Sequence, residues 1–446
     1  MARSGSFLMA ASVLLAAVVV ASMLSSAWSQ NSFGRGRGGP PPVPTDDQLM
    51  IPREIRDRIN ENCAGLGRCV PSRGQGARAR RIKSSAGRAK EKTLRKKMRG
   101  GGDERAARQE RDRLDRKIKQ TKEAALEILG IRSDLVEVVD DGVFEEDFLL
   151  PEPVMDAVIR RGARSRGNRG RGGGRNSGGG SRRRGRRSAA FFENLSQYQW
   201  RGSDLPIKYK ISNDFSSGEA NIIESAVNKI RAAVPCLSFS RVASGASVSG
   251  PRIEFEKFPN PTPGLCGLGT VGKVEVNDIF LNFDSRSCND MEGRAIHEIM
   301  HALGVVHHHN RLDRDKHLTI NWQNVDESAL AAFGYSEWTV FTSYGTAFSP
   351  RSIMHYPAFI GAKNINQPTM QPKSASVAVS ELGQRRFMHA TDVDLLKRTY
   401  CCPSSCDDDH VVCGYWVNEG FCSSGSVYQG WMQQNCRKSC QVCRCG

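Results

Sequence analysis

The chain has 446 residues, enough for two or three domains, and a formal net charge of +17 at pH 7. This charge lies entirely in residues 1–187, which hold 40 Lys and Arg against 22 Asp and Glu, whereas residues 188–446 hold 24 against 25. The near-neutral second part therefore argues against a nucleic-acid-binding function, and we expect no nucleic-acid partner.

The first residues have the pattern of a secretory signal peptide. Arg3 precedes an apolar run over residues 7–24, and the small residues Ala27 and Ser29 follow. This order predicts a signal peptide over residues 1–29 and a secreted, extracellular protein. Because about 18 apolar residues is the lower limit for crossing a bilayer, an uncleaved membrane anchor is the alternative. No other stretch is suited to span, so we expect no stable membrane association.

Residues 30–187 have the composition of a removable segment. Residues 30–45 are rich in Gly, Pro and Arg, which predicts disorder. Residues 103–129 lack Gly and Pro, and their opposite charges often fall three or four positions apart, which predicts an exposed helix. Residues 162–187 consist mostly of Arg, Gly and Ser, which predicts a flexible, protease-accessible linker.

This linker ends in Arg184-Gly185-Arg186-Arg187, a dibasic sequence of the kind that secretory-pathway convertases cut. We therefore predict a basic propeptide over residues 30–187, removed by a convertase-type protease between Arg187 and Ser188. Arg-Gly tracts also bind RNA in some intracellular proteins. An RNA-binding protein is thus a further alternative, but it requires that the signal peptide is not used.

The fourteen cysteines agree with export. Cys63 and Cys69 lie in the basic region and the other twelve follow residue 187. An even number of cysteines in an exported chain predicts disulfide bonds. Cytosolic thiols or a cysteine metal site are the alternatives.

Residues 188–402 alternate between strand and helix patterns. Strands are predicted at residues 205–211, 253–255 and 275–283, and residues 220–233 have the apolar spacing of a helix. Together with a second helix that carries histidines, this pattern predicts an α+β domain large enough to bury a core.

The second helix has the spacing of a zinc site. His297 and His301 are four residues apart and therefore lie on one helix face, with Glu298 beside them. Gly304 allows the chain to turn back, so that His307 can become the third ligand. Three imidazoles leave zinc one open position for water, as in a catalytic site, and Glu298 is placed to act as general base. The alternative is a pair of helix histidines whose hydrogen bonds are satisfied without a metal, beside a polar loop.

Two further histidines, His308 and His309, follow directly. Neighbouring residues cannot all converge on one ion, so we expect these two to support the ligands or to lie at the surface.

Residues 297–315 resemble the signature of the astacin family of zinc endopeptidases within the metzincins, HExxHxxGxxHExxRxDRD. The matching positions are His297, Glu298, His301, Gly304, His307, Arg311, Asp313, Arg314 and Asp315. One position departs, because the acidic residue after the third histidine is His308 here. In the family that carboxylate meets the new N-terminus of the mature enzyme, so this contact lacks its usual partner.

The resemblance implies a metzincin-type, two-lobed zinc protease domain over residues 188–402, with an active-site helix, a Met-turn and one zinc ion per chain. Within residues 352–356, Met354 would lie beneath the metal, and Tyr356 would be a reversible ligand that hydrogen-bonds the tetrahedral intermediate. The family also has similar residues at the positions of Trp200, residues 382–385 and Tyr400. The implied disulfides are Cys236–Cys402 and Cys266–Cys288.

A short acidic stretch in the propeptide carries a second resemblance. Residues 143–148, VFEEDF, are similar to the family's prosegment motif FEGD, whose aspartate takes the place of water on zinc. The resemblance implies that Asp147 is the zinc ligand of a latent zymogen. On its residues alone, a short acidic stretch of this kind is ordinarily a solvated patch, which is the alternative.

The last residues are too rich in cysteine and too poor in apolar mass to build a core, so disulfides must hold them. Residues 406–443 resemble a ShK toxin-like domain, which implies the pairs Cys406–Cys443, Cys413–Cys436 and Cys422–Cys440. Cys401 and Cys445 remain, and we expect them to pair. Channel-blocking relatives of this domain carry a Lys-Tyr pair near the fourth cysteine, and residues 427–435 contain no lysine. We therefore expect a binding module with its own partner rather than a channel blocker. A structural cap is the alternative.

Together these patterns predict a secreted zinc-dependent endopeptidase that is made as a zymogen and hydrolyses extracellular proteins and peptides. A glycosylation sequon is present at Asn194-Leu195-Ser196. The competing class is a non-catalytic extracellular binding protein that keeps the protease fold.

Overall fold

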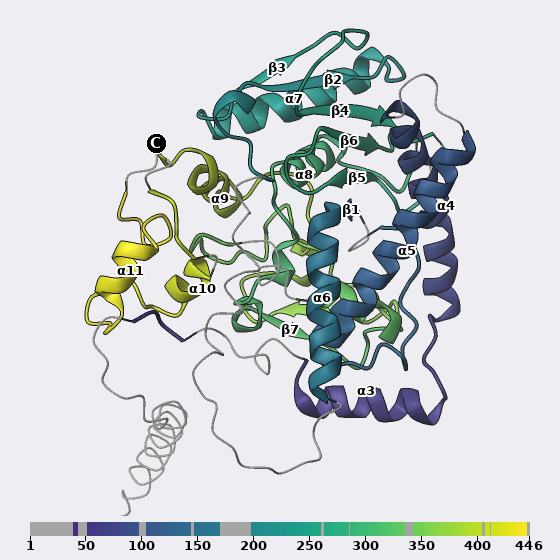
Figure 1. Cartoon of the computed structure of the whole chain (residues 1–446), viewed down its shortest axis with the longest axis vertical. Coiled ribbons are helices and arrows are strands. Elements are labelled where there is room, and N and C mark those ends of the chain that lie inside the picture. Colours follow the sequence, from purple (N-terminus) through teal and green to yellow (C-terminus); the bar gives the residue numbers. More distant parts are fainter. Residues whose placement is uncertain are drawn as a thin grey trace, which may run out of the picture. The chain divides into compact units, whose positions relative to one another are not determined.

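The computed structural model describes residues 39–42, 51–97, 104–143, 147–169, 198–259, 263–284, 286–334, 342–403, 406–410 and 412–443 (Figure 1). The predicted signal peptide, the predicted cleavage site at Arg187 and Ser188, and the sequon at Asn194 lie outside these residues. By its contacts the chain divides into Met1–Pro40 and Pro41–Gly446, and every described helix and strand belongs to the second unit.

A six-stranded sheet with the order β1-β5-β6-β4-β2-β3 carries the first lobe. Neighbouring strands are parallel, except that β5 runs antiparallel to β6. Their bounds are β1 Phe148–Leu149, β2 Ile207–Ile211, β3 Phe239–Arg241, β4 Arg252–Lys257, β5 Gly267–Thr270 and β6 Val276–Leu281. In β2, Ile207, Tyr209 and Ile211 are buried while Lys208 is exposed, as the period of two in an extended chain requires.

Two helices share a hydrophobic core with this sheet. α7 (Ser217–Ala233) begins at a capping box in which Ser216 and Glu219 bond each other's backbone N–H. α8 (Met291–Ala302) is the histidine helix. Ile223 and Ile230 of α7 lie with Ile296 of α8 in one buried cluster. The predicted strands and helix therefore form, with ends that differ by at most three residues.

The chain after α8 builds a second lobe around its own core. β7 (Leu318–Ile320) pairs antiparallel with β8 (Met370–Pro372), and α9 (Ala390–Tyr400) returns to the first core. Short 3-10 helices lie between these parts: η4 His308–Asn310, η5 Arg314–Lys316, η6 Glu327–Phe333 and η7 Val379–Glu381; a further one, η3 Gly202–Asp204, precedes β2. The two cores confirm the predicted α+β, two-lobed class.

Four helices of the basic region pack against these lobes: α3 (Arg53–Gly65), α4 (Arg73–Lys97), α5 (Glu104–Ile128) and α6 (Glu152–Arg169) (Figure 1). The second core is shared, because Ile51, Leu126 and Leu129 of this region lie in one buried cluster with Leu330 and Phe333. The region also contains a disulfide, Cys63–Cys69.

Two expectations for this region were wrong. α5 is not an exposed helix, since Ala107, Ile118 and Leu126 are buried and its Lys122 forms a buried ion pair with Asp141. The sequence of α5 has too few apolar residues to predict its burial. The burial becomes visible only when the surfaces that cover α5 are known. The stretch that begins at residue 162 is also not linker throughout, because α6 continues to Arg169.

Gly162 gives a physical reason for the longer helix. A Cβ at Gly162 would lie 2.6 Å from the backbone of Ala124, so the missing side chain lets α6 pack directly on α5. Packing between helices, rather than intrinsic propensity, supplies most helix stability in proteins.

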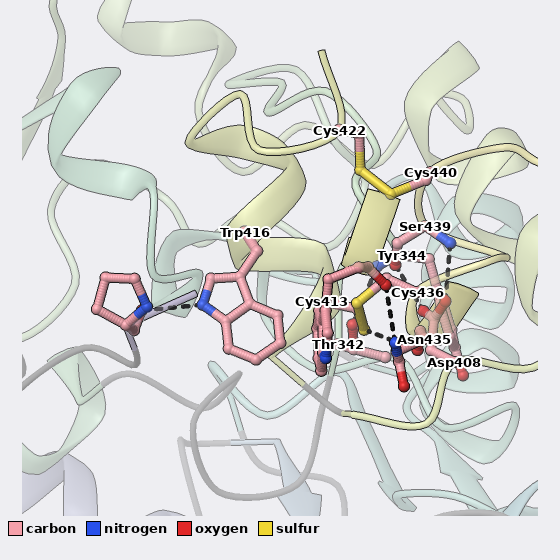
Figure 2. Close-up of a disulfide and its surroundings, with 12 residues drawn as sticks. Thr342, Tyr344, Asp408, Cys413, Trp416, Cys422, Asn435, Cys436, Ser439 and Cys440 are labelled. Carbon is pink, nitrogen blue, oxygen red and sulfur yellow. Dashed lines mark hydrogen bonds between the residues drawn. A yellow bond between two sulfur atoms is a disulfide. The ribbon is translucent and has the colours of Figure 1, made fainter. Parts of the chain in front are cut away.

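The C-terminal module consists of α10 (Cys413–Asn418) and α11 (Gln429–Asn435), held by Cys406–Cys443, Cys413–Cys436 and Cys422–Cys440. Figure 2 shows the last two bridges. These pairings and Cys266–Cys288 are the expected ones. Among the described helices, none combines the length and hydrophobicity needed to cross a membrane.

Two expected pairings were wrong, because Cys236 is bonded to Cys401 rather than to Cys402, and Cys401 is therefore not paired with Cys445. Cys401 caps the end of α9, donating its N–H to Lys397 O, and packs with Cys236 at the edge of the first core. A side chain one position later points in a different direction. Cys402 is itself disulfide-bonded.

Candidate zinc site

The first two predicted ligands lie on α8, and the third follows a sharp turn. His297 and His301 are buried one helical turn apart. The helix ends at Leu303, and Gly304 takes the left-handed conformation (φ 88°) that lets Val305 N–H bond Met300 O at 2.9 Å. This reversal brings buried His307 back to the other two histidines.

Backbone carbonyls fix how the imidazoles face. His297 Nδ1 donates to Ile353 O at 2.9 Å, and His301 Nδ1 donates to Val305 O at 2.7 Å. Each ring therefore presents the unprotonated Nε2, and these two atoms lie 3.1 Å apart. Burial lowers the pKa of His297 to about 3, so its ring is neutral, as a metal ligand must be.

Asp147, from the basic region, completes this group. Its carboxylate oxygens lie 3.3 Å from His297 Nε2, 3.8 Å from His301 Nε2 and 3.0 Å from His307 Nε2. All four ligand atoms fall within 4.8 Å of one another. Burial by itself would raise the pKa of Asp147, but the interactions with His307 and His297 outweigh it and hold the pKa well below its usual range. Phe144, Glu145 and Glu146 of the motif lie outside the described residues.

The residues after Asp147 lie along the edge of the sheet. Phe148 and Leu149 form β1, which pairs in parallel with Gly269 and Thr270 of β5 (Figure 1). Phe148 is fully buried, with its ring centroid 4.9 Å from that of His301. Residues 147–149 thus occupy both the histidine cluster and the β5 edge beside it.

Glu298 is buried beside the cluster with an unused acceptor. Among the described residues its Oε2 has no hydrogen-bond partner. Burial, and then the charge of Asp147, raises the pKa of Glu298 well above its usual range. A Cβ on Gly267 of β5 would overlap Glu298 Oε1, so this glycine makes room for the carboxylate. Sequence reasoning missed Gly267, because the contact joins segments that are distant along the chain.

The predicted Met-turn contacts the histidine segments, since Ile353 O accepts His297 Nδ1–H. Met354 is fully buried, and its carbonyl accepts the N–H of His308 at 2.8 Å. Asp392 of α9 holds the turn by accepting Ser352 Oγ–H at 2.5 Å and Ile353 N–H at 2.9 Å. Sequence reasoning also missed Asp392, since nothing in its local pattern marks a buried carboxylate.

Tyr356 packs between two histidine rings. Its centroid lies 4.0 Å from that of His307 and 4.4 Å from that of His309. The phenol is therefore held next to the third ligand, where the resemblance implied it.

Both additional histidines are buried, so neither is a surface group. His308 Nε2 accepts the N–H of Ser349 at 3.1 Å, and its ring packs on Phe348. His309 Nε2 donates to Ala332 O at 3.0 Å. Burial, and then the charge of Arg311, lowers the pKa of His308 well below its usual range. A neutral imidazole that accepts a backbone N–H thus stands at the position where the signature has an acid.

Other residues that match the family hold the segments around the histidine cluster in place. Arg311 forms a two-bond ion pair with Asp313, at 2.9 and 2.8 Å, and also bonds Thr346 O. Trp200 Nε1 donates to Ala302 O near the end of α8, and Arg385 bonds His355 O in the Met-turn. These contacts connect both lobes to the histidine cluster.

Three inward-facing imidazoles fit a zinc ion, and the glutamate beside them has an acceptor for a water proton, so the fold and site define the class of zinc-dependent metallopeptidases. Residues 192–401 match the model of the Astacin peptidase family, and residues 405–443 match the ShK domain-like model. The chain therefore carries an astacin-family peptidase domain, whose family uses one catalytic zinc, followed by a ShK-like module.

Named relatives agree with this assignment. The chain is 36% identical over 333 residues to zinc metalloproteinase nas-10 and 36% identical over 335 residues to zinc metalloproteinase nas-9, both from Caenorhabditis elegans. Each match covers 74% of this chain and 58% of the relative, so the chain spans somewhat more than half the length of these relatives. The aligned length exceeds the two family matches together, so the similarity extends beyond them.

A solved structure is also similar. It is high choriolytic enzyme 1, a hatching enzyme zinc-protease from the medaka fish Oryzias latipes, at 23% identity and a TM-score of 0.39, covering 47% of this chain and 96% of that one.

Proposed function

We propose that this chain is a secreted, latent zinc-dependent endopeptidase that hydrolyses peptide bonds of extracellular proteins. The observation that carries the proposal is the convergence of His297, His301 and His307 beside the buried carboxylate of Glu298. In this proposal the signal peptide is 1–29, the propeptide 30–187, the peptidase domain 188–402 and the ShK-like module 406–443.

His297, His301 and His307 would hold the zinc through Nε2. When bound, zinc polarises the scissile carbonyl and lowers the pKa of water toward about 7. Glu298 accepts a proton from the attacking water and delivers it to the departing amine, which needs a carboxylate of raised pKa. Tyr356 then donates its phenolic proton in a hydrogen bond to the developing oxyanion.

Substitution of Glu298 tests the proton-transfer role. We expect Glu298→Gln to keep one zinc per chain and to lose about 100- to 10,000-fold in hydrolysis, because the amide cannot accept the proton. The measurement is cleavage of an unfolded protein by the proteolytically activated chain, with and without a zinc chelator, beside the zinc content of each sample.

Glu292→Gln is the matched control, since Glu292 lies on the same helix but bonds Ser225 and Lys229 instead. Its activity should equal that of the unaltered chain. Folded, zinc-loaded unaltered protein without activity would reject the endopeptidase and favour a non-catalytic binding protein.

Latency is the second part of the proposal. The contacts of Asp147 with all three histidines support its role as the zinc ligand of the zymogen. Cleavage by a convertase-type protease between Arg187 and Ser188 would remove the covalent link and allow Asp147 to dissociate with its segment. The disulfides support export, and the sequon at Asn194 is proposed as a glycosylation site.

Substitution of Asp147 tests this latency. We expect uncleaved Asp147→Ala to be about ten- to a hundredfold more active than the uncleaved unaltered chain, since one charge-assisted interaction is lost. Asp134→Ala is the control, because Asp134 pairs with Arg132 at the surface of the same region. If Asp147→Ala stays fully latent, Asp147 is not the inhibitory ligand.

A further inference from the structure

A proline-rich segment at the start of the described chain contacts the C-terminal module. The indole Nε1–H of Trp416 on α10 donates to Pro42 O at 2.9 Å, across 374 positions of sequence. Pro41, next to it, is buried. No sequence pattern predicted this contact.

Trp416 belongs to a small aromatic group that disulfides hold in place. Its ring centroid lies 5.5 Å from that of Trp431 and 5.9 Å from that of His410. The side chain is only 1% exposed and shares a cluster with Cys413 and Cys436, which are bonded to each other (Figure 2). The position of the indole N–H is therefore fixed before any peptide arrives, which lowers the entropic cost of binding.

The chemistry of this contact suits proline. An extended proline-rich chain has no internal hydrogen bonds and no proline N–H, so its carbonyls are free to accept bonds from a partner. Aromatic side chains supply flat apolar surface for the rings, and a tryptophan also supplies a donor for a carbonyl. Residues 40–44 of this chain, PPPVP, are such a segment.

We propose that His410, Trp416 and Trp431 form a binding site for extended proline-rich polypeptide, which the chain's own Pro41-Pro42 segment fills in the uncleaved protein. This site goes beyond the proposed peptidase function. Because Pro41 and Pro42 precede residue 187, removal of the propeptide also empties the site. The module then binds a proline-rich segment of another protein, and so holds the enzyme beside it.

The test uses the full-length chain with the segment removed by substitution. In this vacated chain, Pro40, Pro41, Pro42 and Pro44 are replaced by alanine. It is titrated by calorimetry with a synthetic peptide of residues 37–46, and in parallel with the same peptide in which alanine replaces every proline.

We expect the proline peptide to bind the vacated chain, and the alanine peptide to bind at least about tenfold more weakly. The unaltered chain should bind the proline peptide at least about tenfold more weakly as well, because its own segment competes at an effective concentration near millimolar. Absence of binding to the vacated chain, or equal binding of the two peptides, would overturn the proposal.

Trp416→Phe in the vacated chain isolates the hydrogen bond. The ring is kept and the donor is lost, so the dissociation constant should rise about three- to tenfold. Unchanged affinity would remove Trp416 from the site. Independently of that variant's folding, the indole N–H resonance of Trp416 should differ between the unaltered and the vacated chain, and identical resonances would contradict the contact.

Discussion

Glu298 faces Gly267, and the absence of a side chain there has a catalytic consequence. β5 passes so close to α8 that only glycine leaves space for the carboxylate. Gly267 therefore decides whether the Glu298 carboxylate can occupy its observed position.

We predict that Gly267→Ala displaces Glu298 and lowers kcat by about a hundredfold, the cost of misplacing a reacting group by about 1 Å. The histidines are not touched, so zinc content should be unchanged. The measurement is kcat of the activated enzyme together with its bound zinc. Gly218→Ala on α7, where a Cβ meets nothing within 4 Å, is the control and should keep full activity. Full activity of Gly267→Ala would show that Glu298 reaches its working position from another conformation.

His308 illustrates how one residue changes the family signature at a single point. Its ring accepts a backbone N–H from Ser349, which requires an unprotonated nitrogen, and burial favours that neutral ring. The backbone N–H of His308 donates to Met354 O. The residue thus connects the ligand segment to the turn beneath it.

At the scale of elements, one acidic residue of α6 pairs with two cations of α5. Glu152, at the start of α6, accepts two bonds from Arg113 of α5, at 2.9 and 2.7 Å, and one from Lys117 at 2.9 Å. The bonds from Arg113, followed by those from Lys117, lower the pKa of Glu152 from 4.5 to about 2 despite its partial burial.

This shift predicts an acid-dependent loosening of the two helices. Because the folded pKa lies below the unfolded value, the stabilisation is complete above pH 4.5 and is lost as the pH falls toward 2. Glu152 is 40% exposed, so the contribution stays below about 1 kcal/mol. Amide exchange of α6 should be faster in Glu152→Gln than in the unaltered chain at pH 6, and the difference should vanish near pH 2. A difference that persists at pH 2 would assign the effect to packing instead.

Elements with local signals could be predicted from the sequence, and those that depend on distant partners could not. The spacing of His297, His301 and His307 is a property of one helix and one turn, so it was readable directly. The burial of α5 depends on Gly162 of another helix, and the choice of Cys401 over Cys402 depends on how α9 ends. No local sequence pattern indicates either the burial of α5 or the choice of Cys401.

At the scale of the whole molecule, Cys236–Cys401 ties α7 to the end of α9, across 165 positions. The corresponding bridge of the propeptide, Cys63–Cys69, closes only 6 positions. A bridge that closes a longer loop restricts the unfolded chain more.

We therefore predict unequal losses when the two bridges are removed by paired serine substitutions. Loss of Cys236–Cys401 should lower the free energy of unfolding by about 5 kcal/mol, and loss of Cys63–Cys69 by about 2 kcal/mol. Denaturant unfolding of both variants and of the unaltered chain measures the difference. Equal losses would mean that native packing, rather than loop length, sets the contribution.

The basic region before residue 170 is folded, with its own bridge, a core shared with the second lobe and ion pairs such as Lys92 with Glu256 at 2.7 Å. Cutting the chain between α6 and Tyr198 breaks a covalent link but none of these contacts. If residues 30–187 are the inhibitory propeptide proposed above, the cut turns an intramolecular inhibitor into a separate molecule, whose departure follows mass action. We therefore expect the nicked protein to stay inactive at high concentration and to become active on dilution. In this proposal proteolysis sets whether the enzyme can act, and dilution sets when.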